Sequence, residues 1–241
     1  MVPVGETGQR MSSADEGAVG GPGGSAAQAR GAYPPAAFRE TRSEVLEAFI
    51  CANPFGQLIT TGPTGLHACG APFVLRHGSG GVYLEAHVAR ANPLASRDGA
   101  EALVLFQGPH AYIRPAWYPA KARDGRVVPT WNYIVAQARG VVSIVEDAAW
   151  LRALLDDLTA QQESGFSDPW SPADAPADYV DRLLRGIVGV RLDPVELEGV
   201  WKLNQNHPRE NRLGVVAGLS GMAHPDAAEI AQAMIEGEGG D

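Results

Sequence analysis

The stretch TWNYIVAQARGVVSIV, residues 130–145, is a long run of β-branched, aromatic and small residues that favour a strand. Shorter runs of the same kind precede and follow it, with glycine- or proline-containing turns between them. Short strands at a spacing of about 8–12 residues are typical of a closed or half-closed antiparallel barrel. The other expected strands are residues 57–61, 66–75, 82–87, 102–107, 110–114, 187–192 and 195–202.

Helical patterns flank these strands. Thr41 and Glu44 have the spacing of a capping box and precede an apolar stripe that ends at Ile50, which predicts a helix there. Leucines at helical spacing predict a second helix over residues 147–163. Two further helical segments are expected at residues 178–185 and 208–236. The pattern therefore predicts an α+β protein, a β-barrel with peripheral helices.

Composition narrows the function classes. The 241 residues carry 19 basic and 28 acidic side chains, a net charge of −9, which disfavours nucleic acid as a partner. No run is apolar and long enough for a membrane span. Cys51 and Cys69 cannot form a disulfide framework and indicate a cytoplasmic protein. Residues 1–31, rich in glycine and alanine, are expected to be a disordered tail, and residues 32–241 a single domain with a helical C-terminal segment.

Four segments are too polar and too rich in glycine, proline or asparagine for an ordinary core. They are HVARANP (87–93), FQGPHAYI (106–113), VPTWNY (128–133) and WKLNQN (201–206). Together with Trp117-Tyr118 and in this order, they resemble the PaiB family, usually called FMN-binding negative transcriptional regulators. The resemblance implies a split β-barrel related to pyridoxamine-phosphate oxidase and flavin reductases. It also implies a homodimer with cofactor sites at the interface.

The chain departs from the family pattern at three positions. The family motif Thr-His-Leu-Pro is replaced by Cys69-Gly70-Ala71-Pro72, so its histidine is Gly70 here. A second family histidine, after TWNY, is Gln137, whereas His67 stands where the family commonly carries an apolar residue. This pattern indicates a branch with altered pocket chemistry. One such branch, which this chain resembles, is the haem-dependent piperazate synthases of antibiotic biosynthesis.

The branch resemblance implies an enzyme that binds haem b through an axial histidine. His67 is the first choice for this metal ligand, with small Cys69 and Ala71 on the same strand face. His87, at a glycine-histidine position of the family, is the second choice. The alternative for His67 is a strand-edge histidine that faces water, and for His87 a brace for the following turn.

Other residues are candidates because their chemistry suits a planar, anionic cofactor. Arg90, Arg114 and Lys202 are catalytic candidates as cations for the substrate carboxylate, and Arg90 and Lys202 also suit a phosphate or propionate. An arginine paired to a local carboxylate is the competing interpretation for Arg90. The aromatic residues could wall a planar ring or simply pack in the core. The remaining cofactor-binding candidates are Asn92, Phe106, His110, Trp131, Tyr133 and Gln205.

Two functions follow from these readings. The first is a haem-dependent cyclase that converts N5-hydroxy-L-ornithine to L-piperazic acid by dehydrative N–N bond formation. The alternative is an FMN-binding regulator of the PaiB type or a protein similar to flavin reductases. Two features weigh against the regulator. The chain has a net negative charge, and no expected helix carries the basic residues of a helix that binds in a DNA groove.

Overall fold

The computed structural model describes residues 34–63 and 65–237, in which nine strands form one antiparallel sheet. Seven strands follow the path β3-β2-β6-β7-β8-β5-β4, while β9 pairs with β7 off this path and β1 pairs with β9. The described residues belong to one compact unit that begins at Pro34. The expected disordered tail, residues 1–31, lies outside the described residues. Among the described residues, no helix is long and apolar enough to cross a membrane. The strands are β1 (Arg39–Glu40), β2 (Phe55–Gly62), β3 (Gly65–Pro72), β4 (Val74–Gly78), β5 (Gly81–Ala89), β6 (Glu101–Ile113), β7 (Thr130–Val145), β8 (Ile187–Leu192) and β9 (Glu196–Lys202).

β7 pairs with three strands and so connects β6 and β9 with β8, which continues into β5 and β4. It pairs with β6 along most of its length, with β9 from Tyr133 to Arg139, and with β8 from Val142 to Val145. The barrel interior is an apolar core built from alternate residues of the strands, among them Leu58, Leu84 and Val104. This alternation is the period of two that a half-buried strand requires.

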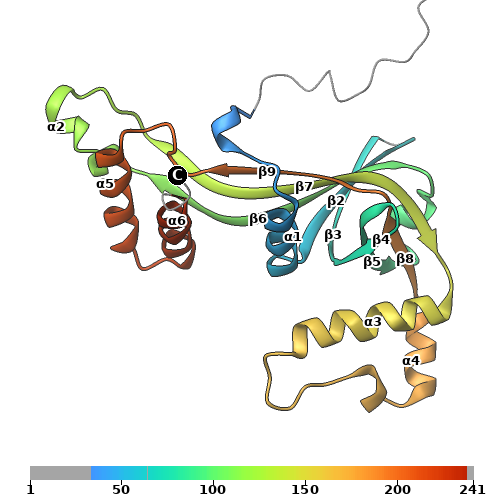
Figure 1. Ribbon diagram of the computed structural model, residues 1–241. Coiled ribbons are helices and arrows are strands. Elements are labelled where there is room, and N and C mark those ends of the chain that lie inside the picture. Colours follow the sequence, from blue (N-terminus) through green and yellow to red (C-terminus); the bar gives the residue numbers. More distant parts are fainter. Residues whose placement is uncertain (1–33, 64, 238–241) are drawn as a thin grey trace, which may run out of the picture. The chain divides into compact units, whose positions relative to one another are not determined.

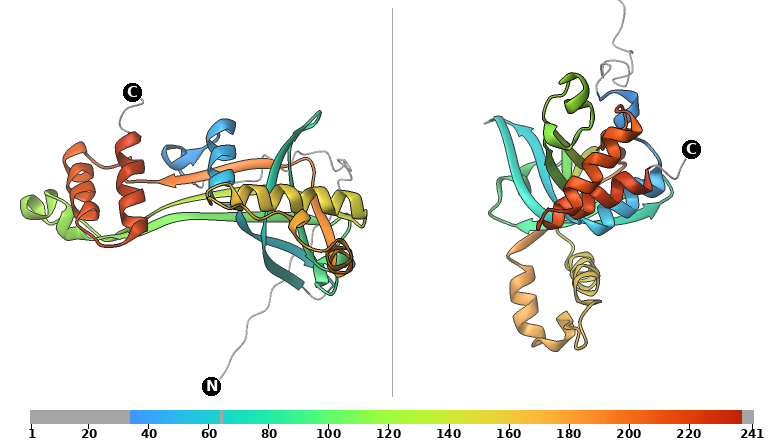
Figure 2. Two further views of the ribbon diagram at one scale, coloured as in Figure 1. Left: turned by 90° about the horizontal axis from the view of Figure 1, so that it is seen from below. Right: turned by 90° about the vertical axis from the view of Figure 1, so that its left-hand side faces the viewer.

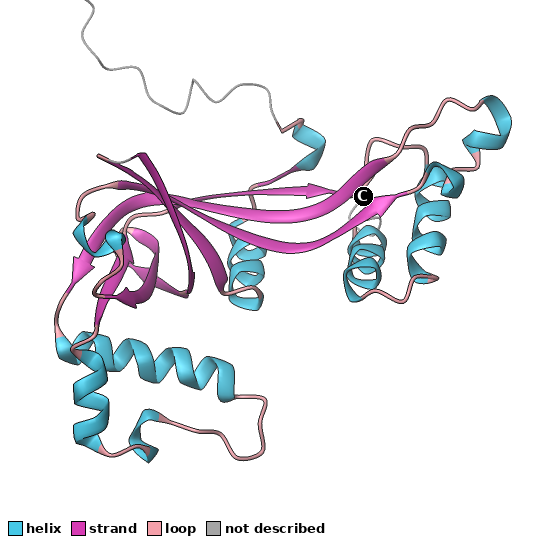
Figure 3. Ribbon diagram, turned by 180° about the vertical axis from the view of Figure 1, so that it is seen from behind, coloured by secondary structure: helices cyan, strands magenta, loops and turns pink. Residues whose placement is uncertain are grey.

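The six α-helices of the described residues lie around this sheet. They are α1 (Ser43–Ala52), α2 (Ala120–Asp124), α3 (Ala148–Glu163), α4 (Ala177–Leu184), α5 (Arg209–Ser220) and α6 (Pro225–Glu236). Helices α1, α5 and α6 lie on the same side of the long strands β6 and β7 (Figures 1 and 3). In Figure 2, α3 and α4 lie side by side in both views, and α3 contacts β4, β5 and β8. The predicted α+β class with peripheral helices is confirmed.

Four details of the predicted elements were wrong. Helix α1 has Arg42 as its N-cap and no side-chain cap, because the Glu40 carboxylate already accepts the N–H groups of Thr41 and Arg42. The expected strand 66–75 divides into β3 and β4 at Phe73, which is buried in the core. The expected strands 102–107 and 110–114 are one strand, β6, because a bulge between Gln107 and His110 accommodates Gly108 and Pro109. The helical segment 208–236 is two helices.

Candidate functional site on the outer sheet face

The sheet face opposite α1, α5 and α6, here called the outer face, carries much exposed apolar surface. Alternate residues of β3, β2, β6, β7 and β9 point to it, while their neighbours form the core. Leu66 is 77% exposed, Phe55 62% and Trp131 52%. Tyr112 and Val141 are also exposed on this face. Patches of this kind on a protein surface mark binding sites.

One end of the outer face is aromatic. The strand register places Tyr112 opposite Trp131 and His110 opposite Tyr133, so these four side chains share a face. The Trp131 ring meets the Tyr112 and His110 rings edge to face, at centroid distances of 5.9 and 5.7 Å. Lys202 of β9 lies opposite Tyr133, with its ammonium 5.9 Å from the ring centroid. Five residues of β6, β7 and β9 therefore lie together at this end of the outer face. Four were predicted as site residues, and Tyr112 is their neighbour.

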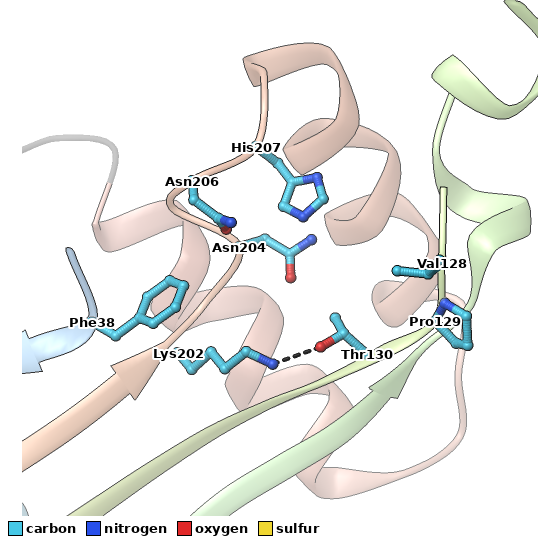
Figure 4. Close-up of a pocket in the computed structure, with 8 residues that line it drawn as sticks. All are labelled: Phe38, Val128, Pro129, Thr130, Lys202, Asn204, Asn206 and His207. Carbon is cyan, nitrogen blue, oxygen red and sulfur yellow. Dashed lines mark hydrogen bonds between the residues drawn. The ribbon is translucent and has the colours of Figure 1, made fainter. Parts of the chain in front are cut away.

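A cavity of about 180 Å³ opens beside this aromatic end, and Figure 4 shows its lining. Two of the motif segments meet in it, VPTWNY and WKLNQN, together with Phe38. Lys202 Nζ donates to Thr130 Oγ1 at 2.5 Å and to the Trp131 carbonyl at 2.7 Å. These bonds fix the lysine, so the cavity has a positive charge at a defined position.

Of the eight residues that line the cavity, Lys202 alone was predicted as a site residue, and Asn204 and His207 are two that were not. Asn204 adopts a left-handed backbone conformation, φ +62°, and its amide donates to the Tyr118 hydroxyl at 2.9 Å. His207, which was expected to be a surface residue, is half-buried and stacks on Tyr118 at a centroid distance of 5.1 Å. Burial, and secondly the charge of Lys202, lower the pKa of His207. In the sequence, His207 stands next to Pro208 in a turn-like segment, and nothing in this pattern predicts its contact with Tyr118.

The two lost family histidines lie in one row of the outer face. Gly70 pairs with Gln57, Gln57 pairs with Leu105, and Leu105 pairs with Gln137 across β3, β2, β6 and β7. A Cβ built on Gly70 would lie 2.7 Å from the Phe55 ring, so this ring occupies the space of the missing side chain. The altered pocket chemistry indicated by these substitutions therefore concerns the outer face.

His67 lies on the opposite, inner face. It shares that face of β3 with Ala71, which is in the core, and with Cys69, which packs against it. Its Nδ1 atom is buried and has no hydrogen-bond partner. His67 therefore cannot take over the position of the histidine replaced by Gly70.

His87 and Arg90 lie in a third place. His87 pairs with Gly189 and faces α3, away from the core residues of β5, and burial lowers its pKa. The Arg90 guanidinium donates to Glu146 at 3.1 Å and to the carbonyl oxygens of Arg185 and Ile187. These contacts match the competing interpretation of Arg90 as a locally paired arginine.

The remaining predicted residues have structural contacts. Phe106 is fully buried and packs edge to face on Phe73. The Asn92 side chain accepts from Leu94 N and caps a short helical turn. Gln205 accepts from Leu203 N and donates to the Trp201 carbonyl, while Arg114 precedes the turn 115–117. Within the described ranges, no group of three or more histidine, cysteine or acidic residues could hold a metal ion.

Comparison with known sequences identifies relatives of this chain. A family model described as a putative FMN-binding domain matches residues 32–195. The protease synthase and sporulation protein PAI 2 of Bacillus subtilis is 30% identical over 208 residues, covering 84% of this chain and 96% of the relative. An uncharacterized protein of Emericella nidulans is 32% identical over 229 residues, covering 79% of this chain and 91% of the relative.

Comparison with solved structures shows the fold. The FAD and heme binding protein from Mycobacterium smegmatis aligns with a TM-score of 0.52 at 18% identity, over 75% of this chain and 80% of that one. The flavocytochrome Anf3 from Azotobacter vinelandii aligns with a TM-score of 0.52 at 13% identity, over 68% and 69%. The predicted split β-barrel is confirmed.

Proposed function

The chain belongs to the family of putative FMN-binding domains, as its resemblance to the PaiB family implied, and from this premise we propose that it binds FMN on the aromatic end of the outer face. The observation that carries the proposal is that three features lie next to one another on one surface. Exposed Tyr112 and Trp131 lie beside the fixed ammonium of Lys202, and the 180 Å³ cavity adjoins them.

These residues fit the two chemical parts of FMN. The isoalloxazine ring is planar and largely apolar, so it can stack on exposed Trp131 and Tyr112. The phosphate is anionic and suits a lysine at the mouth of a polar cavity lined by Asn204 and Asn206. Bound FMN supplies redox chemistry, and the protein supplies position and charge.

A second copy of the chain is the proposed cover of the outer face. Leu66, Phe55 and Val141 extend the exposed apolar surface far beyond the aromatic end. A stable interface needs about 800 Å² from each partner, and a half-apolar sheet face of five strands is suited to supply it. The homodimer implied by the resemblance would then hold the ring of FMN between two chains.

A haem-dependent cyclase is the second candidate, and one observation favours it. His67 has a buried Nδ1 atom without a partner beside small residues on the inner face, and an imidazole there is available as an axial ligand of haem b; the Nδ1 atom of His87 is buried and unpartnered as well. The two solved structures at a TM-score of 0.52 are described as binding both flavin and haem or as a flavocytochrome. Bound haem supplies a Lewis acid for the loss of water from N5-hydroxy-L-ornithine.

In this second candidate, the protein would orient the substrate. A cation must hold the carboxylate so that the α-amine lies close to N5, and positioning then supplies much of the rate. Of the three predicted cations, Arg90 already pairs with Glu146, and Lys202 lies at the aromatic end. Arg114 is left as the candidate for this role.

The absorption spectrum of the purified protein tests the first candidate. We expect a flavin band near about 450 nm, and Trp131→Ala and Lys202→Met should each weaken FMN binding by about tenfold or more. Trp170→Ala and Lys121→Met are the matched controls, because Trp170 is similarly exposed in the α3–α4 connection and Lys121 is the other lysine of the chain.

The same measurement identifies the second candidate. A Soret band near about 400–415 nm that shifts in His67→Ala, but not in His87→Ala, would support haem and reject FMN as the resident cofactor. A colourless protein that binds neither cofactor would contradict both candidates. Conversion of N5-hydroxy-L-ornithine to L-piperazic acid, followed by mass spectrometry, is the direct assay of the cyclase.

A further inference from the structure

Three buried polar atoms without partners gather at one end of the β2–β3 hairpin. They are Thr60 Oγ1, His67 Nδ1 and Arg97 Nε. Thr60 and His67 are directly opposite in the ladder of β2 and β3, so their side chains leave the sheet on the same, inner face. Thr60 is only 2% exposed, whereas His67 and Arg97 are half-buried.

The Arg97 guanidinium reaches this place because a side chain is missing. Gly62 lies two residues beyond Thr60 on the same face of β2 and pairs with Gly65. A Cβ built on Gly62 would lie 1.1 Å from Arg97 Nη1, so the guanidinium occupies the space above this glycine. Gly62 is the diagonal neighbour of His67 across the ladder, so the guanidinium above Gly62 lies on the same face of the hairpin as His67.

No carboxylate compensates the charge of Arg97 in the part of the chain that the structure describes. The neighbouring Cys69 adds no compensating charge either, because burial raises the pKa of its thiol and outweighs the lowering effect of the Asn92 side chain. Buried polar groups normally have partners, and three unpaired ones together point to a missing group that accepts hydrogen bonds. A guanidinium, a hydroxyl and an imidazole all donate to oxygen.

We propose that Thr60, His67 and Arg97 form a binding site for an oxyanion, a carboxylate or a phosphate group, on the inner face at the end of the β2–β3 hairpin. The Arg97 fork would supply the charge and two parallel donors, and Thr60 the deepest hydrogen bond. The site lies on the inner face and is therefore separate from the outer face that is proposed to bind FMN.

Calorimetric titration of the purified full chain tests this site. Sodium phosphate and sodium acetate are the two probes, each at constant ionic strength against sodium chloride. We expect saturable binding of one of them, weakened about tenfold or more in Arg97→Gln and in Thr60→Val. Gly62→Ala should also weaken it, because the new Cβ displaces the guanidinium. Arg182→Gln, in α4, is the control and should bind as the unchanged protein does.

Each outcome decides the proposal. Tighter binding of phosphate assigns a phosphate group, and tighter binding of acetate assigns a carboxylate. If neither anion binds more tightly than chloride, or if Arg97→Gln binds like the unchanged protein, the three atoms are solvated by water and the proposal is wrong. Thermal unfolding without anion verifies that each variant is folded, and Thr60→Val preserves shape.

The test is independent of the proposed cofactor. Arg97→Gln should leave the flavin band unchanged, and Trp131→Ala should leave anion binding unchanged. A Soret band that shifts in His67→Ala would instead assign His67 to haem and overturn the oxyanion site.

Discussion

Gly214 illustrates how a single missing methyl group sets the position of a helix. It lies within α5, where alanine would normally be preferred by about 1 kcal/mol. A Cβ at this position would lie 2.1 Å from the carbonyl oxygen of Trp117. The backbone of residues 115–117 therefore approaches α5 more closely than any other residue type permits.

Gly214→Ala should destabilise the protein by about 1–3 kcal/mol despite its gain in helix propensity, because the backbone contact must open. Urea unfolding followed by circular dichroism measures the change. Gly165→Ala is the matched control, since a Cβ there meets no atom within 4 Å. An unchanged or raised stability of the Gly214 variant would contradict the close contact.

Two half-buried histidines predict how stability depends on pH. Burial lowers the pKa of His87, and burial with the charge of Lys202 lowers that of His207, both from an ordinary value of 6.5. The unfolded chain therefore binds protons more readily than the folded chain, so stability is full above pH 6.5 and decreases as the pH falls through it.

Unfolding free energies at pH 7.5 and at pH 5.5 check this dependence. The decrease on acidification should be smaller in His87→Gln and in His207→Gln than in the unchanged protein. His224→Gln, which removes an exposed histidine, should keep the full decrease. An equal decrease in all four proteins would show that other groups cause it.

At the scale of elements, α3 is tied to the sheet by Arg76, which bridges the exposed Asp157 of α3 and the buried Glu85 of β5. Arg76 of β4 donates to Glu85 of β5 at 2.5 Å and to Asp157 of α3 at 2.6 Å. The Glu85 side chain is 5% exposed, so its charge depends on Arg76. Removing one partner of such a pair leaves a buried charge without compensation.

Arg76→Met should therefore cost about 2–4 kcal/mol of unfolding free energy and increase hydrogen exchange in α3. Arg152→Met, which removes the exposed pair of Arg152 with Asp181, should cost less than about 1 kcal/mol. Equal costs for the two variants would mean that Arg76 does not hold α3 in place.

The elements that the sequence predicted best are those with a clear period. Residues 130–145 and 148–163 are a strand and a helix as expected, because alternation and a leucine stripe are local signals. The bulge at Gly108-Pro109 and the break at Phe73 depend on contacts with distant strands. The motifs also predicted Lys202, Trp131 and Tyr133, but not that Gly70 and Gln137 share a row, since this follows from the strand order β3-β2-β6-β7.

At the scale of the whole molecule, the proposed dimer places the exposed apolar residues of the outer face at its interface. If a second copy covers the outer face, a charge on this face must separate the copies, because an unpaired charge buried at an apolar interface is costly. Leu66→Glu should convert a dimer into a monomer, as measured by light scattering. Leu213→Glu, on exposed α5, should remain dimeric. A monomeric unchanged protein would contradict the proposed dimer.

β7 has a consequence for anyone who wishes to divide or re-engineer this protein. Because it pairs with β6, β9 and β8, a break anywhere within residues 130–145 leaves two fragments that each hold only part of this central strand. New chain termini or an inserted reporter domain belong instead in the exposed connection at residues 164–171, between α3 and α4. A circular permutant opened there retains every strand ladder.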